Sequence, residues 1–180
     1  MLVDIQSMTK TDRRAGNFLQ SGAALLEFAV LLPLLVILLF GLVEFGRALL
    51  QENTLTKAVT TGARYLARMP NLMTPPPHCD PGTGWAAAVA QAEALIEKDN
   101  AGAGNVILPG LDGEGTITFD GAWRNEAVSV SGSTVYINVC VIEVEAVTPF
   151  VSMSGDSLVP FFQLGPVNLT ARAEERYIGE

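Results

Sequence analysis

Charged residues are scarce in this chain of 180 residues: they make up 17% of it, whereas apolar residues make up 49%. Such a balance excludes an intrinsically disordered chain. Basic residues are scarcer than acidic ones, 11 against 19, so the formal net charge is −8. No basic cluster exists beyond Arg13 and Arg14. The sequence therefore lacks the basic footprint of a nucleic-acid-binding protein, and we expect no nucleic-acid partner.

Cysteine is nearly absent, with only Cys79 and Cys140. Two cysteines are too few for a disulfide-rich scaffold, but they are enough for one disulfide in an oxidising compartment. A disulfide between them would close a loop of about sixty residues and contribute on the order of 4 kcal/mol. The alternative is a pair of buried free thiols.

Charge is absent altogether from the longest apolar run, which lies within residues 23–43. As a helix these residues would span about 32 Å, roughly one hydrocarbon core. The formal charge is +2 over residues 1–68 (seven basic, five acidic) and −10 over residues 69–180 (four basic, fourteen acidic). With the basic residues ahead of the run, the positive-inside rule places the N-terminus in the cytoplasm and the C-terminal part on the other side of the membrane.

Two residues are unusual for a simple membrane anchor. Pro33 lies within the run, where a membrane helix tolerates proline better than a soluble one does. Glu27 lies near its cytoplasmic end, and a carboxylate in a membrane helix is unfavourable. Either Glu27 snorkels to the interface, or it is a buried acid that requires a positively charged partner.

A recognisable pattern starts in the basic leader and continues through SGAALLEFAVLLPLLVILLFGLVEFGRAL and then TTGARYLAR. It resembles a type IV prepilin, and more narrowly the TadE-like pseudopilins of the tight-adherence (Tad or Flp) pilus system. The resemblance covers about residues 13–68 and extends weakly to the C-terminal LTARAEERY, whereas residues 70–165 resemble no family.

This resemblance implies a processing site and an assembly site. A prepilin peptidase would cut after Gly22, so that Ala23 becomes the new N-terminus. Glu27 would then be the fifth mature residue, and Phe28 would fill the aromatic position after it. In a filament, the Glu27 carboxylate could pair with the N-terminal ammonium group of a neighbouring subunit, because a buried charge is acceptable when it is paired.

The resemblance also implies an α+β, pilin-like fold. We expect a leader peptide at 1–22, a long N-terminal helix at 23–68 whose residues 23–43 are transmembrane or in a filament core, and an α+β domain at 69–180. An amphipathic stripe continues the helix, Pro70 ends it, and Glu44 and Arg47 are spaced as an i,i+3 ion pair. The stripe consists of Phe45, Ala48, Leu49, Leu55, Val59, Ala63 and Leu66.

The remaining chain predicts one helix and a small antiparallel sheet. The helix covers Trp85–Lys98, and the strands cover Thr116–Phe119, Thr134–Val147 and Val167–Ala173. Within the middle strand, Val135, Ile137, Val139 and Val141 form one apolar face that we expect to face the core. Glu143 and Glu145 continue that face and are expected to mark where the strand leaves the core.

Nothing in the sequence indicates a cofactor, a metal site or a catalytic centre. His78 is the only histidine, and its neighbours Cys79 and Asp80 cannot easily face one ion together with it. Asp112, Glu114 and Asp120 lack the spacing of an EF-hand loop. Glu143 and Glu145 have no nucleophile motif around them, so we expect no enzyme.

The sequence thus predicts a minor pilin or pseudopilin made as a single-pass inner-membrane precursor, a substrate of a prepilin peptidase and not itself an enzyme. Its other partners would be further pilin subunits and the inner-membrane pilus assembly platform, and its final location the pilus or cell surface. An alternative is a permanently anchored periplasmic scaffold subunit that keeps residues 1–22. A third hypothesis, a secreted enzyme on a tether, lacks a supporting polar constellation.

Overall fold

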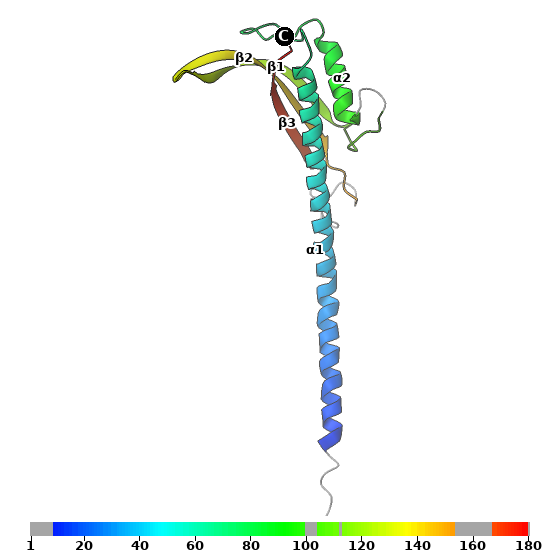
Figure 1. Ribbon diagram of the computed structural model, residues 1–180. Helices are drawn as coiled ribbons and strands as arrows, with labels where there is room; N and C mark the ends of the chain where they lie inside the picture. Colours follow the sequence, from blue (N-terminus) through cyan, green and yellow to red (C-terminus); the bar gives the residue numbers. More distant parts are fainter. Residues whose placement is uncertain (1–8, 100–103, 112, 154–166, 180) are drawn as a thin grey trace, which may run out of the picture. The chain divides into compact units, whose positions relative to one another are not determined.

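The computed structural model describes residues 9–99, 104–111, 113–153 and 167–179, with side chains described from residue 22 onward. Its elements follow one another as helix α1 (Thr9–Ala67), helix α2 (Trp85–Lys98) and strands β1 (Thr116–Val130), β2 (Ser133–Pro149) and β3 (Asn168–Arg176) (Figure 1). The strands form one antiparallel sheet in the order β1-β2-β3. A long N-terminal apolar helix followed by a small three-stranded antiparallel sheet confirms the predicted α+β class.

Two compact units divide the chain, Met1–Val43 and Glu44–Glu180. We call the second unit the body, and residues 22–43 of the first unit the apolar segment. Helix α1 continues through Pro33, which lies inside it, and begins at Thr9, earlier than the predicted residue 23.

The core of the body lies between the C-terminal part of α1, α2 and one face of the sheet. The predicted α1 stripe is buried only from Leu55 onward, because Phe45 and Leu49 are 58% and 44% exposed. From α2, Ala88, Ala92 and Ile96 are buried. Among the described residues, the large apolar side chains with almost no exposure are Leu55, Val59, Leu66, Ile96, Leu111, Ile142 and Val144.

Close packing of α1 on α2 depends on Gly62. A Cβ atom at this position would lie 2.6 Å from two side-chain atoms of Ile96. Glycine costs a helix interior about 1 kcal/mol relative to alanine. Gly62, which interrupts the apolar stripe in the sequence, is therefore the point where the Ile96 side chain fits against α1.

The predicted core face of the middle strand is wrong. The buried side chains that contact the core are Cys140, Ile142, Val144 and Ala146, on the opposite face of β2. Val135 is 46% exposed, near the free end of the hairpin. Because a strand alternates faces with each residue, the whole predicted set moves to the outer face.

Ion pairs on that outer face explain why an apolar run occurs there. Val139 and Val141 are buried, although they lie on the outer face. Around them Arg124 pairs with Glu174, and Arg176 with Glu126 at 3.6 Å. Long charged side chains cover apolar surface with their stems and keep their heads in water. Glu143, expected to mark the end of the core, pairs instead with Arg172 across the sheet.

The residues directly after β3 bond to the end of α1 and to the chain that follows it. The Tyr177 hydroxyl accepts a hydrogen bond from the Leu72 N–H at 2.7 Å, and its oxygen lies 2.9 Å from the Met69 carbonyl oxygen. Beyond it, the Ile178 N–H donates to the Ala67 carbonyl at 2.9 Å, which satisfies a carbonyl that the helix end leaves free. The two stretches that carry the sequence resemblance, the long helix and LTARAEERY, therefore meet within the body.

Candidate assembly segment

The apolar segment is exposed along almost all of its length. None of residues 22–43 is buried, and Leu25, Phe28 and Leu39 are 70%, 57% and 63% exposed. Apolar patches on monomeric soluble proteins rarely exceed a few hundred Å², and larger ones mark membrane or protein contacts. The helix is long and apolar enough to cross a membrane, and none of its most apolar window is buried. It is thus compatible with a single-pass membrane anchor.

Glu27 lies on this exposed surface without a positive partner. It is exposed, and none of the ion pairs among the described residues involves it. Its neighbours Leu26, Phe28 and Val30 are large apolar side chains that are likewise exposed. If apolar surroundings cover this segment, the carboxylate requires a partner from outside the described chain.

Gly22 and Ala23 begin the apolar segment and lie within α1. A Cβ atom built on Gly22 would meet nothing within 4 Å. Packing among the described residues therefore gives no reason for glycine at position 22, unlike at Gly62. Ala23 and Glu27 are spaced i,i+4, so they lie on the same side of the helix, about 6 Å apart along its axis.

A second glutamate was missed as a site by the sequence reasoning. Glu44, the first residue of the body, is fully buried. Its Oε1 accepts a hydrogen bond from the Met153 N–H at 2.9 Å and lies 3.7 Å from the Arg47 guanidinium. The predicted i,i+3 pair with Arg47 is therefore present. No local pattern indicated its burial, because the uncharged run that Glu44 ends has no buried residue.

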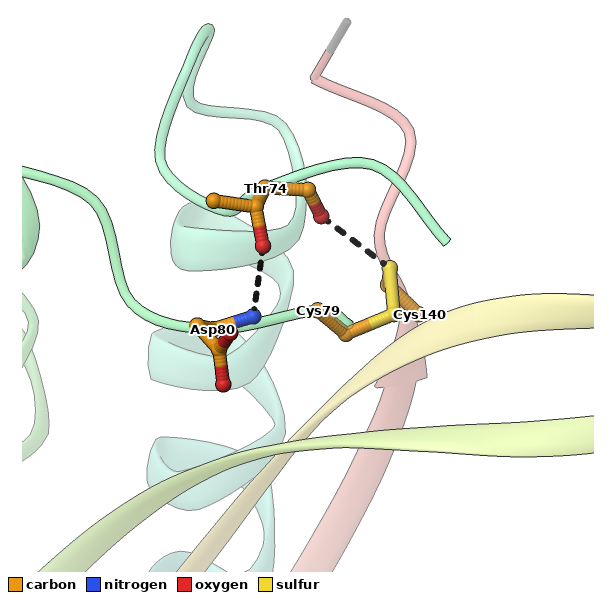
Figure 2. The surroundings of a disulfide bond; sticks show 4 residues. All are labelled: Thr74, Cys79, Asp80 and Cys140. Carbon is orange, nitrogen blue, oxygen red and sulfur yellow. Dashed lines mark hydrogen bonds between the residues drawn. A yellow bond between two sulfur atoms is a disulfide. The ribbon is translucent and has the colours of Figure 1, made fainter. Parts of the chain in front are cut away.

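The two cysteines lie together in the body. Cys79, in the proline-rich loop, is joined to Cys140 on β2 with a Cα–Cα distance of 5.4 Å (Figure 2). The loop before Cys79 is closed by Thr74, whose hydroxyl accepts from the Asp80 N–H at 2.8 Å and whose N–H donates to the Asp80 carbonyl at 2.9 Å. Both cysteines are buried, 1% and 4% exposed. The structure therefore has the disulfide and not the alternative pair of free thiols.

The histidine and acidic residues considered as metal ligands do not form a cluster among the described residues. His78 and Asp80 are exposed in the same loop. Glu114 is in the turn just before β1, and Asp120 is on β1. Asp112 lies outside the described residues. Within the described ranges, no three His, Cys, Asp or Glu side chains are placed to hold a metal ion.

Comparison with known proteins finds a family over one part of the chain. Residues 22–64 match the family described as TadE-like protein. No curated protein and no solved structure matches the chain. The family match begins at Gly22, the first residue of the apolar segment, and ends at Arg64 in the last turn of α1. Residues 22–64, which include the apolar segment, are therefore similar to TadE-like proteins.

Proposed function

We propose that this chain is a minor pilin or pseudopilin of a tight-adherence (type IVc) pilus, and that a prepilin peptidase processes it after Gly22. The observation that carries the proposal is the TadE-like match over residues 22–64 together with an apolar segment in which no residue from 22 to 43 is buried. A filament of bundled helices would cover that segment, and so would a membrane before assembly. The role is structural: the chain is a substrate of the peptidase and a contact for other subunits and the assembly platform.

Glu27 has the central part in assembly. Cleavage after Gly22 creates an α-ammonium group on Ala23, and this cation can pair with the Glu27 carboxylate of a neighbouring subunit. Breaking a buried ion pair by removing one partner costs about 3–5 kcal/mol, because it leaves an uncompensated charge. The pair thus fixes the register of each added helix, and a repeated contact that does not close on itself builds a filament.

The body would lie outside the cytoplasm. The +2 charge of residues 1–68 and the −10 charge of residues 69–180 favour a cytoplasmic N-terminus and a periplasmic domain. The disulfide between Cys79 and Cys140 supports the same compartment, since disulfides persist in the oxidising periplasm. After assembly the protein would be in the pilus or at the cell surface.

A substitution at Glu27 tests the pairing. Glu27→Gln keeps the shape of the side chain and removes its charge, so we expect normal leader cleavage and at least a tenfold lower amount of the protein in sheared pili. Glu52→Gln is the matched control, because Glu52 is another exposed glutamate on α1. Wild-type incorporation of the Glu27→Gln chain would contradict the pairing.

A substitution at Gly22 tests the processing. Gly22→Ala should leave the precursor uncut in the membrane, as seen by the electrophoretic mobility of the chain in native membranes. Gly41→Ala is the matched control, because a Cβ at Gly41 also meets nothing within 4 Å. Normal cleavage of the Gly22→Ala chain would contradict this site and favour the alternative of an anchored scaffold.

A further inference from the structure

The β1–β2 hairpin extends beyond the sheet. Strand β3 pairs with β2 only over Val141–Pro149, whereas β1 pairs with β2 as far as Val130 and Ser133. The outer part of the hairpin is therefore a ribbon of two strands, drawn in yellow at its tip in Figure 1. Tyr136 and Val135 in this ribbon are 68% and 46% exposed, and they lie on opposite faces of β2. Two-stranded ribbons are marginally stable in water, so this one is a candidate for a further partner.

One edge of the ribbon has free hydrogen-bonding groups of known direction. The Cys140 carbonyl accepts a hydrogen bond from the Tyr177 N–H at 2.8 Å, so the backbone of Cys140 faces the β3 side of β2. Backbone groups alternate sides along an antiparallel strand. Thr134, Tyr136 and Asn138 therefore direct their N–H and C=O groups to the same side. No other strand among the described residues pairs with them there.

This edge lacks the usual protection against pairing. No charged residue occurs between Glu126 and Glu143, and residues 133–139 (STVYINV) contain neither proline nor glycine. Natural edge strands are commonly blunted by lysine, proline or an inward-pointing charge. The opposite edge of the hairpin is formed by β1, which carries Asp120, Arg124 and Glu126. The uncharged segment of β2 instead has the β-branched and aromatic composition of a pairing strand.

We propose that residues 133–139 of β2 form a strand-addition surface, and that a second copy of this chain occupies it. Two such edges related by a two-fold axis would run antiparallel, with the outward backbone groups of Thr134, Tyr136 and Asn138 bonding to those of the partner copy. The two hairpins would then make one continuous four-stranded sheet.

Self-pairing fits the side chains as well as the backbone. Opposite residues of an antiparallel pair lie on the same face of the sheet. Tyr136 would therefore contact the face of the other copy that carries Thr134, Tyr136 and Asn138. Val135 and Ile137 meet their counterparts on the other face and bury apolar surface. The absence of charge removes the like-charge repulsion that normally opposes pairing of identical edges. Because the same patch is used by both copies, the contact closes as a dimer.

The contact is small, about seven residues from each copy, so dilute chains would associate weakly through it. Chains held in one membrane have a much higher effective concentration, which strengthens such a contact without new interactions. The full chain in a lipid bilayer is therefore the proper sample.

The test is photo-cross-linking from position 136. The full chain is purified with p-benzoylphenylalanine in place of Tyr136, in two differently tagged forms that are reconstituted together into liposomes. We expect an adduct of twice the chain mass that carries both tags and joins position 136 to residues 133–139. If illumination gives no such adduct, or joins position 136 to another region, the proposal is wrong.

Two proline variants separate the edge from other contacts, since the N-terminal helices can also associate. Thr134→Pro removes an outward-facing N–H, so the β1–β2 ladder loses no hydrogen bond. Ser129→Pro is the matched control: Ser129 lies opposite Thr134, and its N–H faces the other edge of the hairpin. We expect at least a fivefold loss of adduct for Thr134→Pro and no loss for Ser129→Pro.

The adduct yields of the two proline variants are compared with each other. Equal adduct yields in both, whether retained or lost, would overturn the assignment of the contact to the β2 edge. If Thr134→Pro changes the far-ultraviolet circular dichroism of the chain, Thr134→Lys replaces it. This variant leaves the backbone intact and places two like charges at the paired edges, and it should lower the adduct yield by a similar factor.

Discussion

Removal of the disulfide should cost the body a large part of its stability. The perturbation is the double substitution Cys79→Ala and Cys140→Ala. Both cysteines are buried, 1% and 4% exposed, so alanine leaves small apolar gaps and no unpaired polar atom. Serine would be a poorer choice, because each buried hydroxyl would require a new hydrogen-bond partner.

The magnitude follows from the length of the closed loop. The cysteines are 61 residues apart in sequence. The chain-entropy relation for a loop of that length gives about 4 kcal/mol at 25 °C, and the lost sulfur contacts add to it. A domain has about 5–15 kcal/mol of stability in total, so the double variant should still fold but be close to its limit.

The assay is urea unfolding of the full chain in detergent micelles, followed by the fluorescence of Trp85 and Trp123. We expect the free energy of unfolding to fall by about 4 kcal/mol in the double variant, with a steeper dependence on urea because the unfolded chain without the cross-link exposes more surface. Reduction of the wild-type chain should give a loss of similar size. A loss below about 1 kcal/mol would refute the reasoning, because the loop would then be constrained without the disulfide.

Two further substitutions test the packing of the body by the same unfolding assay. Gly62→Ala should lower the free energy of unfolding by about 1 kcal/mol, since the added methyl group overpacks against Ile96 by more than the gain in helix propensity. Gly46→Ala, whose added methyl group meets nothing within 4 Å, should cause no loss, and equal losses would refute the contact. Glu44→Ala should lower the same quantity by about 1–3 kcal/mol, because the Met153 N–H loses its acceptor, and an unchanged value would show that this hydrogen bond contributes nothing.

The apolar run and the helical periodicity of the sequence predicted the two helices well. The uncharged run from Phe28 to Val43 and the 3.6-residue stripe after it predicted one long helix, and α1 contains both. The helix Trp85–Lys98 has the predicted bounds. These patterns are local, so they can be recognised without knowledge of the tertiary contacts.

The sheet could be predicted only in part. Strand β1 extends to Val130, well past the predicted Phe119. Residues 120–130 lack an apolar alternation, so the sequence pattern did not indicate a strand there. They form one because they pair with β2. Both faces of β2 are apolar near Cys140, so periodicity alone could not show which face is buried. Which face of β2 is buried depends on contacts between residues distant in sequence, among them the ion pair of Arg124 with Glu174 on the outer face.

Some site residues could be predicted from a local motif, and one could not. The proposed cleavage and pairing roles of Gly22, Ala23, Glu27 and Phe28 rest on a motif of adjacent residues, and the structure adds that this segment is exposed and that Glu27 has no partner in the described chain. The burial of Glu44 depends on Met153, which is 109 residues away. No local pattern could have shown that contact.

Leader cleavage is the central claim of this account, and the N-terminus of the protein in its native membranes tests it most directly. The measurement is the intact mass together with N-terminal sequencing of the purified chain. Processing after Gly22 predicts a chain that begins Ala-Ala-Leu-Leu-Glu, with or without a methyl group on Ala23. A chain that still contains residues 1–22 would contradict peptidase processing, and Glu27 would then lack the ammonium partner of the proposed pairing.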